Sequence, residues 1–172
     1  LRSVAIAALH QYPLEVARLR LLNHGFNTTY RVVTTDGRRF ALRLNVNSRR
    51  TPQNLAAEAA WLAALGAETD LWVPVPQRTN EGALTTEVFS PDLGRSLPVA
   101  LFSWLPGSDL GDAATPDQLR AVGRATAVLH EHGERSRLRH HHAPLRAGRA
   151  LHERRAVRLD ADHPRVPRRE LP

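Results

Sequence analysis

The stretch TTYRVVTTDGRRFALRLN, residues 28–45, decides the fold. Its first half is rich in threonine, valine and tyrosine, which favour strands, and its second half alternates apolar side chains with others. Between the halves, Asp36-Gly37 predicts a tight hairpin turn, because such a turn needs residues that tolerate positive φ. We therefore expect two antiparallel strands, 28–35 and 38–45, joined by this turn.

The segments on both sides extend the hairpin into a sheet with helices. Residues 16–21 alternate arginine with leucine, as a half-exposed strand does, and turn residues follow at 23–27. Thr51-Pro52 has the form of a helix start, and this helix is expected to end at Gly66. The other expected elements are helices at 1–11 and 115–129 and strands at 73–78, 83–89 and 97–104. This order predicts an α+β fold in which one helix crosses an antiparallel sheet.

Length and composition limit the possible classes of protein. The chain has 172 residues, 42% of them hydrophobic, and a mean hydropathy of -0.38, which suits one soluble domain or two small lobes. No apolar run is long enough to span a membrane and no secretory signal is recognisable, so we expect a cytoplasmic protein without a membrane partner. The absence of cysteine excludes disulfides, thiolate catalysis and cysteine-bound zinc.

The net charge of +7 is concentrated near the end of the chain. Residues 133–172 hold 11 of the 24 arginines and only five acidic residues, whereas residues 1–132 are almost neutral. This basic tail has no aromatic residue, so we expect it to be disordered. Two interpretations of the tail stay open. It could bind nucleic acid through phosphate neutralisation, although no recognition motif supports this, or it could be the product of a reading frame lost near residue 133.

Arg43 and Glu58 are the first candidates for chemistry. Strand alternation puts Ala41 and Arg43 on the face opposite Leu42. Glu58 falls within the apolar stripe of the next helix, where a carboxylate is costly unless a cation meets it. We therefore expect Arg43 and Glu58 to pair. A purely structural ion pair, or a glutamate at the edge of the stripe, is the alternative.

Six stretches together resemble a known family. They are GFNTTYRV (25–32), FALR (40–43), EAAWL (58–62), VPVP (73–76), LFSWLPG (101–107) and VGRATAVLH (122–130). In this order and spacing, residues 16–132 resemble the N-terminal lobe, the hinge and the following helix of the aminoglycoside phosphotransferase superfamily. The resemblance is closest to its type II homoserine kinase and stress-response kinase-like members.

The resemblance implies a protein-kinase-like organisation with ATP as cofactor. Residues 1–104 would be the nucleotide-binding N-terminal lobe, and residues 105–132 the hinge and the first helix of the second lobe. Residues 133–172 would be a tail outside the family pattern. The intact family fold transfers the γ-phosphoryl group of ATP to a hydroxyl acceptor with the help of Mg²⁺.

The same resemblance assigns roles to individual residues in the lobe. Gly25 and Asn27 would lie at the turn that covers the phosphates. Ala41 would lie beside the base. Arg43, where many relatives have lysine, would contact phosphates while Glu58 orients it.

Three further residues would belong to the hinge. Phe102, Ser103 and Leu105 occupy its place, and the backbone of Ser103 and Leu105 would contact the edge of the adenine. Without the family match, the following Pro-Gly would predict only a turn.

The catalytic part of the family pattern is not recognised in the sequence. His132-Gly133-Glu134 follows too directly on the preceding helix to be the His-Gly-Asp-type loop, and Asp160 and Asp162 lack the apolar β context of a metal-binding aspartate. We therefore assign no catalytic and no metal-binding residue. We expect the ATP-binding portion of a phosphotransferase, truncated and inactive alone, whose acceptor, a small molecule or a protein, is open.

Overall fold

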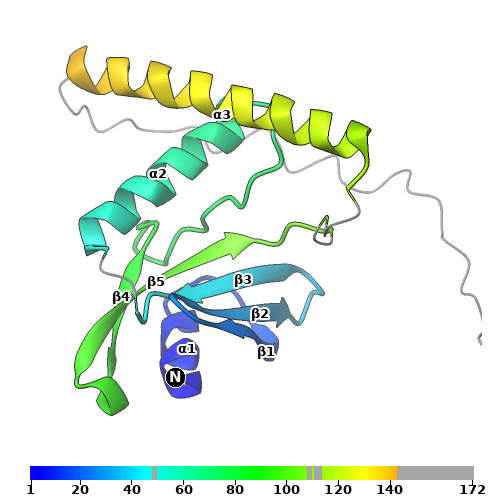
Figure 1. Cartoon of the computed structure of the whole chain (residues 1–172). Coiled ribbons are helices and arrows are strands. Elements are labelled where there is room, and N and C mark those ends of the chain that lie inside the picture. Colours follow the sequence, from blue (N-terminus) through cyan, green and yellow to red (C-terminus); the bar gives the residue numbers. More distant parts are fainter. Residues whose placement is uncertain (48–49, 108–109, 111–113, 143–172) are drawn as a thin grey trace, which may run out of the picture. The chain divides into compact units, whose positions relative to one another are not determined.

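A computed structural model describes residues 1–47, 50–107, 110 and 114–142 of the chain (Figure 1). The chain divides into two compact units, Leu1–Arg135 and Ser136–Pro172, and the second contributes only the last turns of a helix to the described residues. In chain order the elements are α1 (Arg2–Leu9), β1 (Val16–His24), β2 (Thr28–Thr34), β3 (Arg39–Leu44), α2 (Pro52–Glu68), β4 (Thr86–Ser90), the short 3₁₀ turn η1 (Pro91–Leu93), β5 (Arg95–Ser103) and α3 (Pro116–His142).

The strands form one antiparallel sheet in the order β1-β2-β3-β5-β4. β3 lies at its centre, hydrogen-bonded to β2 on one side and to β5 on the other. The predicted α+β fold, with an antiparallel sheet and one helix between β3 and the next strand, is therefore confirmed. No helix in the described residues is both long and apolar enough to cross a membrane.

One face of the sheet carries the main hydrophobic core. Alternate residues of each inner strand point into it, because successive side chains of a strand lie on opposite faces. α1 covers this face with one side of its helix (Figure 1). The core residues include Val4, Ala5, Ala8 and Leu9 of α1, Tyr30 and Val32 of β2, Phe40, Leu42 and Leu44 of β3, and Leu97, Val99 and Leu101 of β5.

The turn between β2 and β3 forms where Asp36-Gly37 predicted it. Gly37 has a φ of 82°, in the left-handed region that glycine adopts without steric cost. The Thr34 hydroxyl donates to the Asp36 carboxylate, and Arg38 binds the same carboxylate at 2.7 Å. These hydrogen bonds lower the pKa of Asp36 to about 2, and the one from Thr34 has the largest effect.

This turn gives a prediction for acid stability. A carboxylate whose pKa is lower in the folded chain stabilises the fold above its ordinary pKa of about 3.9. That stabilisation is lost as the pH falls through the folded pKa of about 2. We expect Thr34→Val to raise the pKa of Asp36 toward its ordinary value in an NMR titration. Thr35→Val is the control, since the Thr35 hydroxyl donates to Glu15. An unchanged Asp36 pKa in Thr34→Val would contradict this explanation.

Residues 73–78 do not form the expected strand. In the described structure this segment makes only an isolated bridge between Pro76 and Phe102. It still lies along β5, with Ser103 N–H donating to the Val75 carbonyl at 2.8 Å and Gln77 N–H donating to the Leu101 carbonyl at 2.7 Å. The Val75 N–H donates to the side-chain hydroxyl of Ser103 and not to a backbone carbonyl, so the regular ladder with β5 is interrupted there.

Gly66 does not end α2, contrary to the expectation. The helix continues to Glu68, and Thr69 is its C-cap. A Cβ added at Gly66 would lie 2.8 Å from a methyl carbon of Val75 and 3.4 Å from one of Val73. Glycine at this position therefore allows α2 to approach the 73–78 segment closely.

The remaining boundaries agree in part with the expectations. β4 begins at Thr86, three residues later than expected, and β5 begins two residues before the expected run and ends at Ser103, one residue before its expected end. α3 begins at the predicted capping box but continues to His142, so His132-Gly133-Glu134 are helical and form no loop. The first ten residues of the expected disordered tail are therefore helical. The rest of that tail, 143–172, lies outside the described residues.

Candidate functional site

The second face of the sheet carries the candidate site. Arg43 lies on β3 opposite Thr29 of β2 and Ala100 of β5, and its side chain leaves the sheet on the face away from Leu42. Because β3 is the central strand, hydrogen bonds on both sides hold the backbone that carries Arg43. The sheet therefore fixes the backbone position from which the Arg43 side chain extends.

Glu58 reaches the same place from α2. Thr51 caps this helix together with Asn54, each side chain bonding the backbone of the other, and Pro52 occupies its first turn. Glu58 Oε1 lies 2.9 Å from Arg43 Nη1, and both side chains are about three-quarters buried, with exposed fractions of 22% and 24%. The predicted pair between Arg43 and Glu58 is therefore present.

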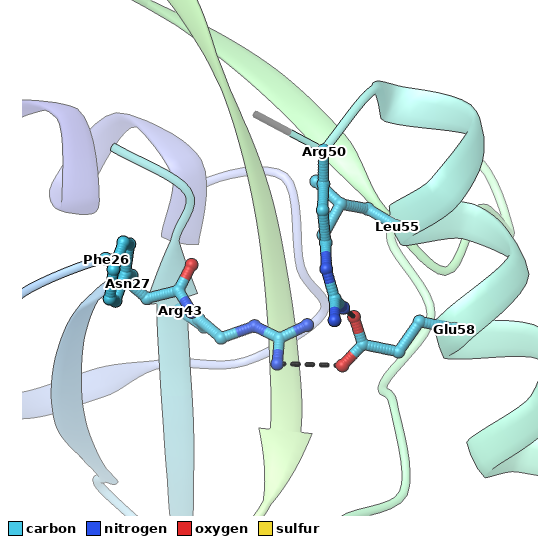
Figure 2. Close-up of a pocket in the computed structure, with 6 residues that line it drawn as sticks. All are labelled: Phe26, Asn27, Arg43, Arg50, Leu55 and Glu58. Atoms are coloured by element: carbon cyan, nitrogen blue, oxygen red, sulfur yellow. Dashed lines mark hydrogen bonds and ion pairs between the residues drawn. The ribbon is translucent and has the colours of Figure 1, made fainter. Parts of the chain in front are cut away.

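A second arginine binds the same carboxylate. Arg50 Nη1 lies 2.7 Å from Glu58 Oε2, so each oxygen of Glu58 faces one guanidinium (Figure 2). The group of three carries two positive charges and one negative charge. It therefore has a surplus of positive charge.

A pocket of about 380 Å³ opens beside these charges. Figure 2 shows both guanidinium groups turned toward Glu58, with Phe26 and Asn27 on the β1–β2 turn and Leu55 on α2. The residues that line the pocket are Phe26, Asn27, Arg43, Arg50, Leu55 and Glu58. Three segments distant in sequence, the turn, β3 and the start of α2, thus meet around one cationic pocket.

The turn at this pocket is held by its own backbone and by Asn47. The Gly25 N–H donates to the Asn27 carbonyl at 3.0 Å. The Asn47 side chain donates to the Gly25 carbonyl at 2.8 Å, and the Asn47 N–H donates to that of Phe26 at 3.0 Å. The Phe26 side chain is 80% exposed. Of the two turn residues predicted for the site, Asn27 lines the pocket and Gly25 does not.

Ala41 and Phe102 lie on the same face as Arg43, although neither lines the pocket. They are direct partners in the β3–β5 ladder. The guanidinium carbon of Arg43 lies 4.9 Å from the centre of the buried Phe102 ring. This distance is within the range of a cation–π interaction. The Arg43 guanidinium thus contacts the Phe102 ring of β5 and forms an ion pair with Glu58 of α2.

Ser103 and Leu105 come at the end of β5. The Ser103 N–H donates to the Val75 carbonyl at 2.8 Å, and the Val75 N–H donates to the Ser103 hydroxyl oxygen at 2.9 Å. Leu105 follows the end of the strand and is exposed. Both residues lie apart from the pocket that Arg43 lines.

Sequence reasoning missed Arg50, Phe26 and Leu55 as pocket residues. A signal for Arg50 was present, since it directly precedes the capping Thr51 and a long side chain there can reach along the first turns of the helix. Leu55 belongs to the apolar stripe of α2, which pointed to the core. Phe26 is exposed, and only the fold brings it beside Arg43.

A buried histidine joins α2 to α3. His132 of α3 is only 2% exposed, and its Nδ1 accepts a hydrogen bond from Trp61 Nε1 at 3.0 Å. His132 Nε2 lies 3.4 Å from a carboxylate oxygen of Glu68. Trp61 is one helical turn after Glu58, so the helix that carries Glu58 is held on its next turn by α3.

Comparisons with known proteins agree with this arrangement. The model of the phosphotransferase enzyme family (APH) matches residues 18–171, a range that continues past residue 132, where the recognised motifs end. The chain therefore belongs to the APH phosphotransferase family. No curated protein gives a significant match.

Two solved structures share the fold. A microcompartment-associated aminopropanol kinase is 31% identical with a TM-score of 0.64, over 77% of this chain and 40% of that one. The amicoumacin kinase hAmiN, in complex with AMP-PNP, Ca²⁺ and Ami, is 18% identical with a TM-score of 0.55, over 65% of this chain and 33% of that one. The chain thus spans well under half of the length of each of these kinases. The described residues are a kinase-like N-terminal lobe with the first helix beyond it.

Within the described residues, no group of three or more histidine, aspartate or glutamate side chains is arranged to hold a metal ion. Glu58, the only acidic residue among the described residues that line the pocket, has an arginine on each oxygen. The residues of this pocket therefore suit an anion, and no metal-binding step is assigned to them.

Proposed function

We propose that residues 1–132 form the ATP-binding lobe of a phosphotransferase that moves the γ-phosphoryl group of ATP to a hydroxyl acceptor. The observation that carries this proposal is the ion pair between Arg43 and Glu58 at a cationic pocket. A guanidinium held by a carboxylate keeps further N–H donors that can bind phosphate oxygens. The fork of arginine differs from the point charge of lysine, so the phosphates would be bound in a different geometry.

The phosphate group would lie between Arg43 and the β1–β2 turn. Asn27 lines the pocket at this turn, and its side-chain amide is an additional donor. Gly25 has open space around the position where a Cβ would stand, so the turn leaves room for a ligand beside its backbone. This location agrees with the place of the phosphates in kinase-like folds.

The adenine would lie along the same face, toward the end of β5. Ala41 and Phe102 are neighbours there, and alanine leaves room for a flat ring. The N–H and C=O of one strand residue point to the same edge of the strand. The edge that the Ser103 N–H and C=O share faces Val75. On this edge the Val75 N–H donates to the Ser103 hydroxyl oxygen and not to the Ser103 carbonyl. We propose that the Ser103 carbonyl and the Leu105 N–H contact the adenine edge.

The transfer step needs groups that we do not assign to this lobe. In the intact fold Mg²⁺ neutralises charge on the β- and γ-phosphates, and an aspartate positions the acceptor hydroxyl. We propose that residues 1–132 bind the nucleotide but do not catalyse phosphoryl transfer from it. The likeness to aminopropanol kinase favours small amino alcohols as the first acceptors to test with the whole protein. Because ATP is the phosphoryl donor, we propose a cytoplasmic location.

Calorimetry on the purified chain tests this proposal. We expect ATP to bind with a Kd in the micromolar to millimolar range. We expect CTP and UTP to bind more weakly, because the hinge backbone would not match a pyrimidine ring. No ATP hydrolysis is expected in the presence of Mg²⁺. An ATP titration that produces no heat of binding would contradict the binding proposal. Rapid Mg²⁺-dependent ATP hydrolysis would contradict the proposal that this chain binds the nucleotide without catalysis.

A further inference from the structure

Arg31 of β2 lies on the face of the sheet that carries the candidate site. It is the direct ladder partner of Ala41, which precedes Arg43 by two positions on β3. Side chains of direct partners lie on the same face of the sheet. Two positions along a strand correspond to roughly 7 Å. Arg31 is therefore displaced from Arg43 toward the place proposed for the adenine.

The Arg31 side chain makes a contact across the central strand. Its guanidinium carbon lies 6.0 Å from the centre of the Trp104 ring, at the outer limit of a cation–π interaction. Trp104 directly follows Ser103, the last residue of β5, and β3 lies between β2 and β5 in the sheet. The contact therefore spans the strand that carries Ala41, whose small side chain leaves room for it.

The polar surroundings of Arg31 give no structural reason for an arginine at this position. The Arg31 Nε–H is buried, and no described residue accepts a hydrogen bond from it. A buried donor without a partner is unfavourable. The two cross-strand neighbours, Arg20 and Ala41, offer no negative charge, and like charges opposite each other on neighbouring strands are destabilising. A ligand that lies over Ala41, in contrast, would contact the Arg31 guanidinium.

We infer that Arg31, held across β3 by Trp104, is the flat surface on which the purine ring of the nucleotide stacks. A guanidinium is planar and stacks on aromatic rings, and unstacked nucleobases stack on arginine in the same way. The inference rests on the proposed nucleotide-binding function and deepens it, because it names a residue that binds the base. Arg43 would bind the phosphates, and Arg31 would bind the base.

The test compares ATP with inorganic tripolyphosphate, which has the phosphates and lacks the base. Both affinities are measured by calorimetry on the full chain at constant salt. In Arg31→Gln we expect the ATP affinity to fall about tenfold, as for the loss of one stacking contact, and the tripolyphosphate affinity to stay within about twofold. Arg31→Lys keeps the charge and loses the planar group, so we expect a similar loss of ATP affinity.

Arg20→Gln is the matched control for these variants. Arg20 lies on the same face, directly opposite Arg31 on β1, and is exposed. We expect its affinities for ATP and tripolyphosphate to stay within about twofold of the wild type.

An NMR measurement on the wild-type chain does not depend on how the variants fold. It follows the Nε–H signal of Arg31, assigned by through-bond correlations. We expect ATP to shift this signal, because the ring current of a stacked purine acts on the guanidinium, and we expect tripolyphosphate to leave it in place. A signal that both ligands shift equally, or that neither shifts, would contradict stacking.

The possible outcomes separate the two proposals. Unchanged ATP affinity in Arg31→Gln, or an equal loss for ATP and tripolyphosphate, overturns the role of Arg31, while ATP binding by the wild type still supports the nucleotide-binding function. Wild-type ATP affinity in Arg31→Lys also overturns stacking, because the charge alone would then be sufficient. A wild-type chain that does not bind ATP overturns both proposals.

Discussion

We expect Arg43→Ala to reduce the proposed affinity for ATP by about 30-fold or more and to leave the fold intact, which is the largest functional effect expected. The proposed contact is a charge-assisted hydrogen bond from Arg43 to a phosphate, and removing one member of such a charge pair between binding partners costs about 2–5 kcal/mol, where each 1.4 kcal/mol is a factor of ten. The fold is spared because Arg43 lies on the face opposite Leu42 and the main core. Glu58 keeps Arg50 as a partner in this variant.

Arg39→Ala is the control for this experiment. Arg39 lies on the same strand and the same face, two positions before Ala41, but it is exposed and does not line the pocket. We expect its ATP affinity to stay within about twofold of the wild type. Arg43→Lys, which keeps a positive charge at this position, is expected to keep most of the binding. Equal ATP affinities for Arg43→Ala and Arg39→Ala would show that the nucleotide does not bind at this pocket.

The largest effect on stability is expected one position earlier on the same strand. Leu42 has no exposed surface and lies between Tyr30 and Leu101, its partners on the two neighbouring strands. A Leu→Ala change in a core of this kind costs about 2–5 kcal/mol, because it removes buried methyl groups and leaves a cavity. Urea unfolding followed by circular dichroism measures this change in the free energy of unfolding.

The matched control for Leu42→Ala is Leu21→Ala on the edge strand β1. Leu21 is 50% exposed, so the same change is expected to cost less than about 1 kcal/mol there. If both variants unfold at the same urea concentration, the face of β3 that carries Leu42 does not form the stabilising core. Together with Arg43→Ala, this experiment assigns stability to one face of the strand and ligand binding to the other.

Strand alternation and helix periodicity were enough to predict the pair between Arg43 and Glu58. Both patterns are local, and the crossing of α2 over the sheet follows from the element order. The segment 73–78 was predicted wrongly because its valines favour a strand, whereas the Val75 N–H donates to the Ser103 side chain in place of a ladder carbonyl and leaves only an isolated bridge. Gly66 was predicted wrongly because its effect depends on Val75, a residue of another segment.

The parts of the site that escaped prediction depend on long-range contacts. Trp61 and His132 are 71 positions apart, and neither has a local pattern that indicates the other. The approach of Phe26 to the pocket depends on how the β1–β2 turn is held by Asn47. Such contacts are formed by the fold and cannot be read from the spacing of residues.

The contact between Trp61 and His132 has a thermodynamic consequence. α2 carries both Glu58, which binds Arg43 in the pocket, and Trp61, which binds His132 of α3. If the position of α2 affects both contacts, ligand binding and the attachment of α3 are linked equilibria. Linkage is reciprocal, so the factor by which α3 strengthens nucleotide binding equals the factor by which the nucleotide strengthens the attachment of α3.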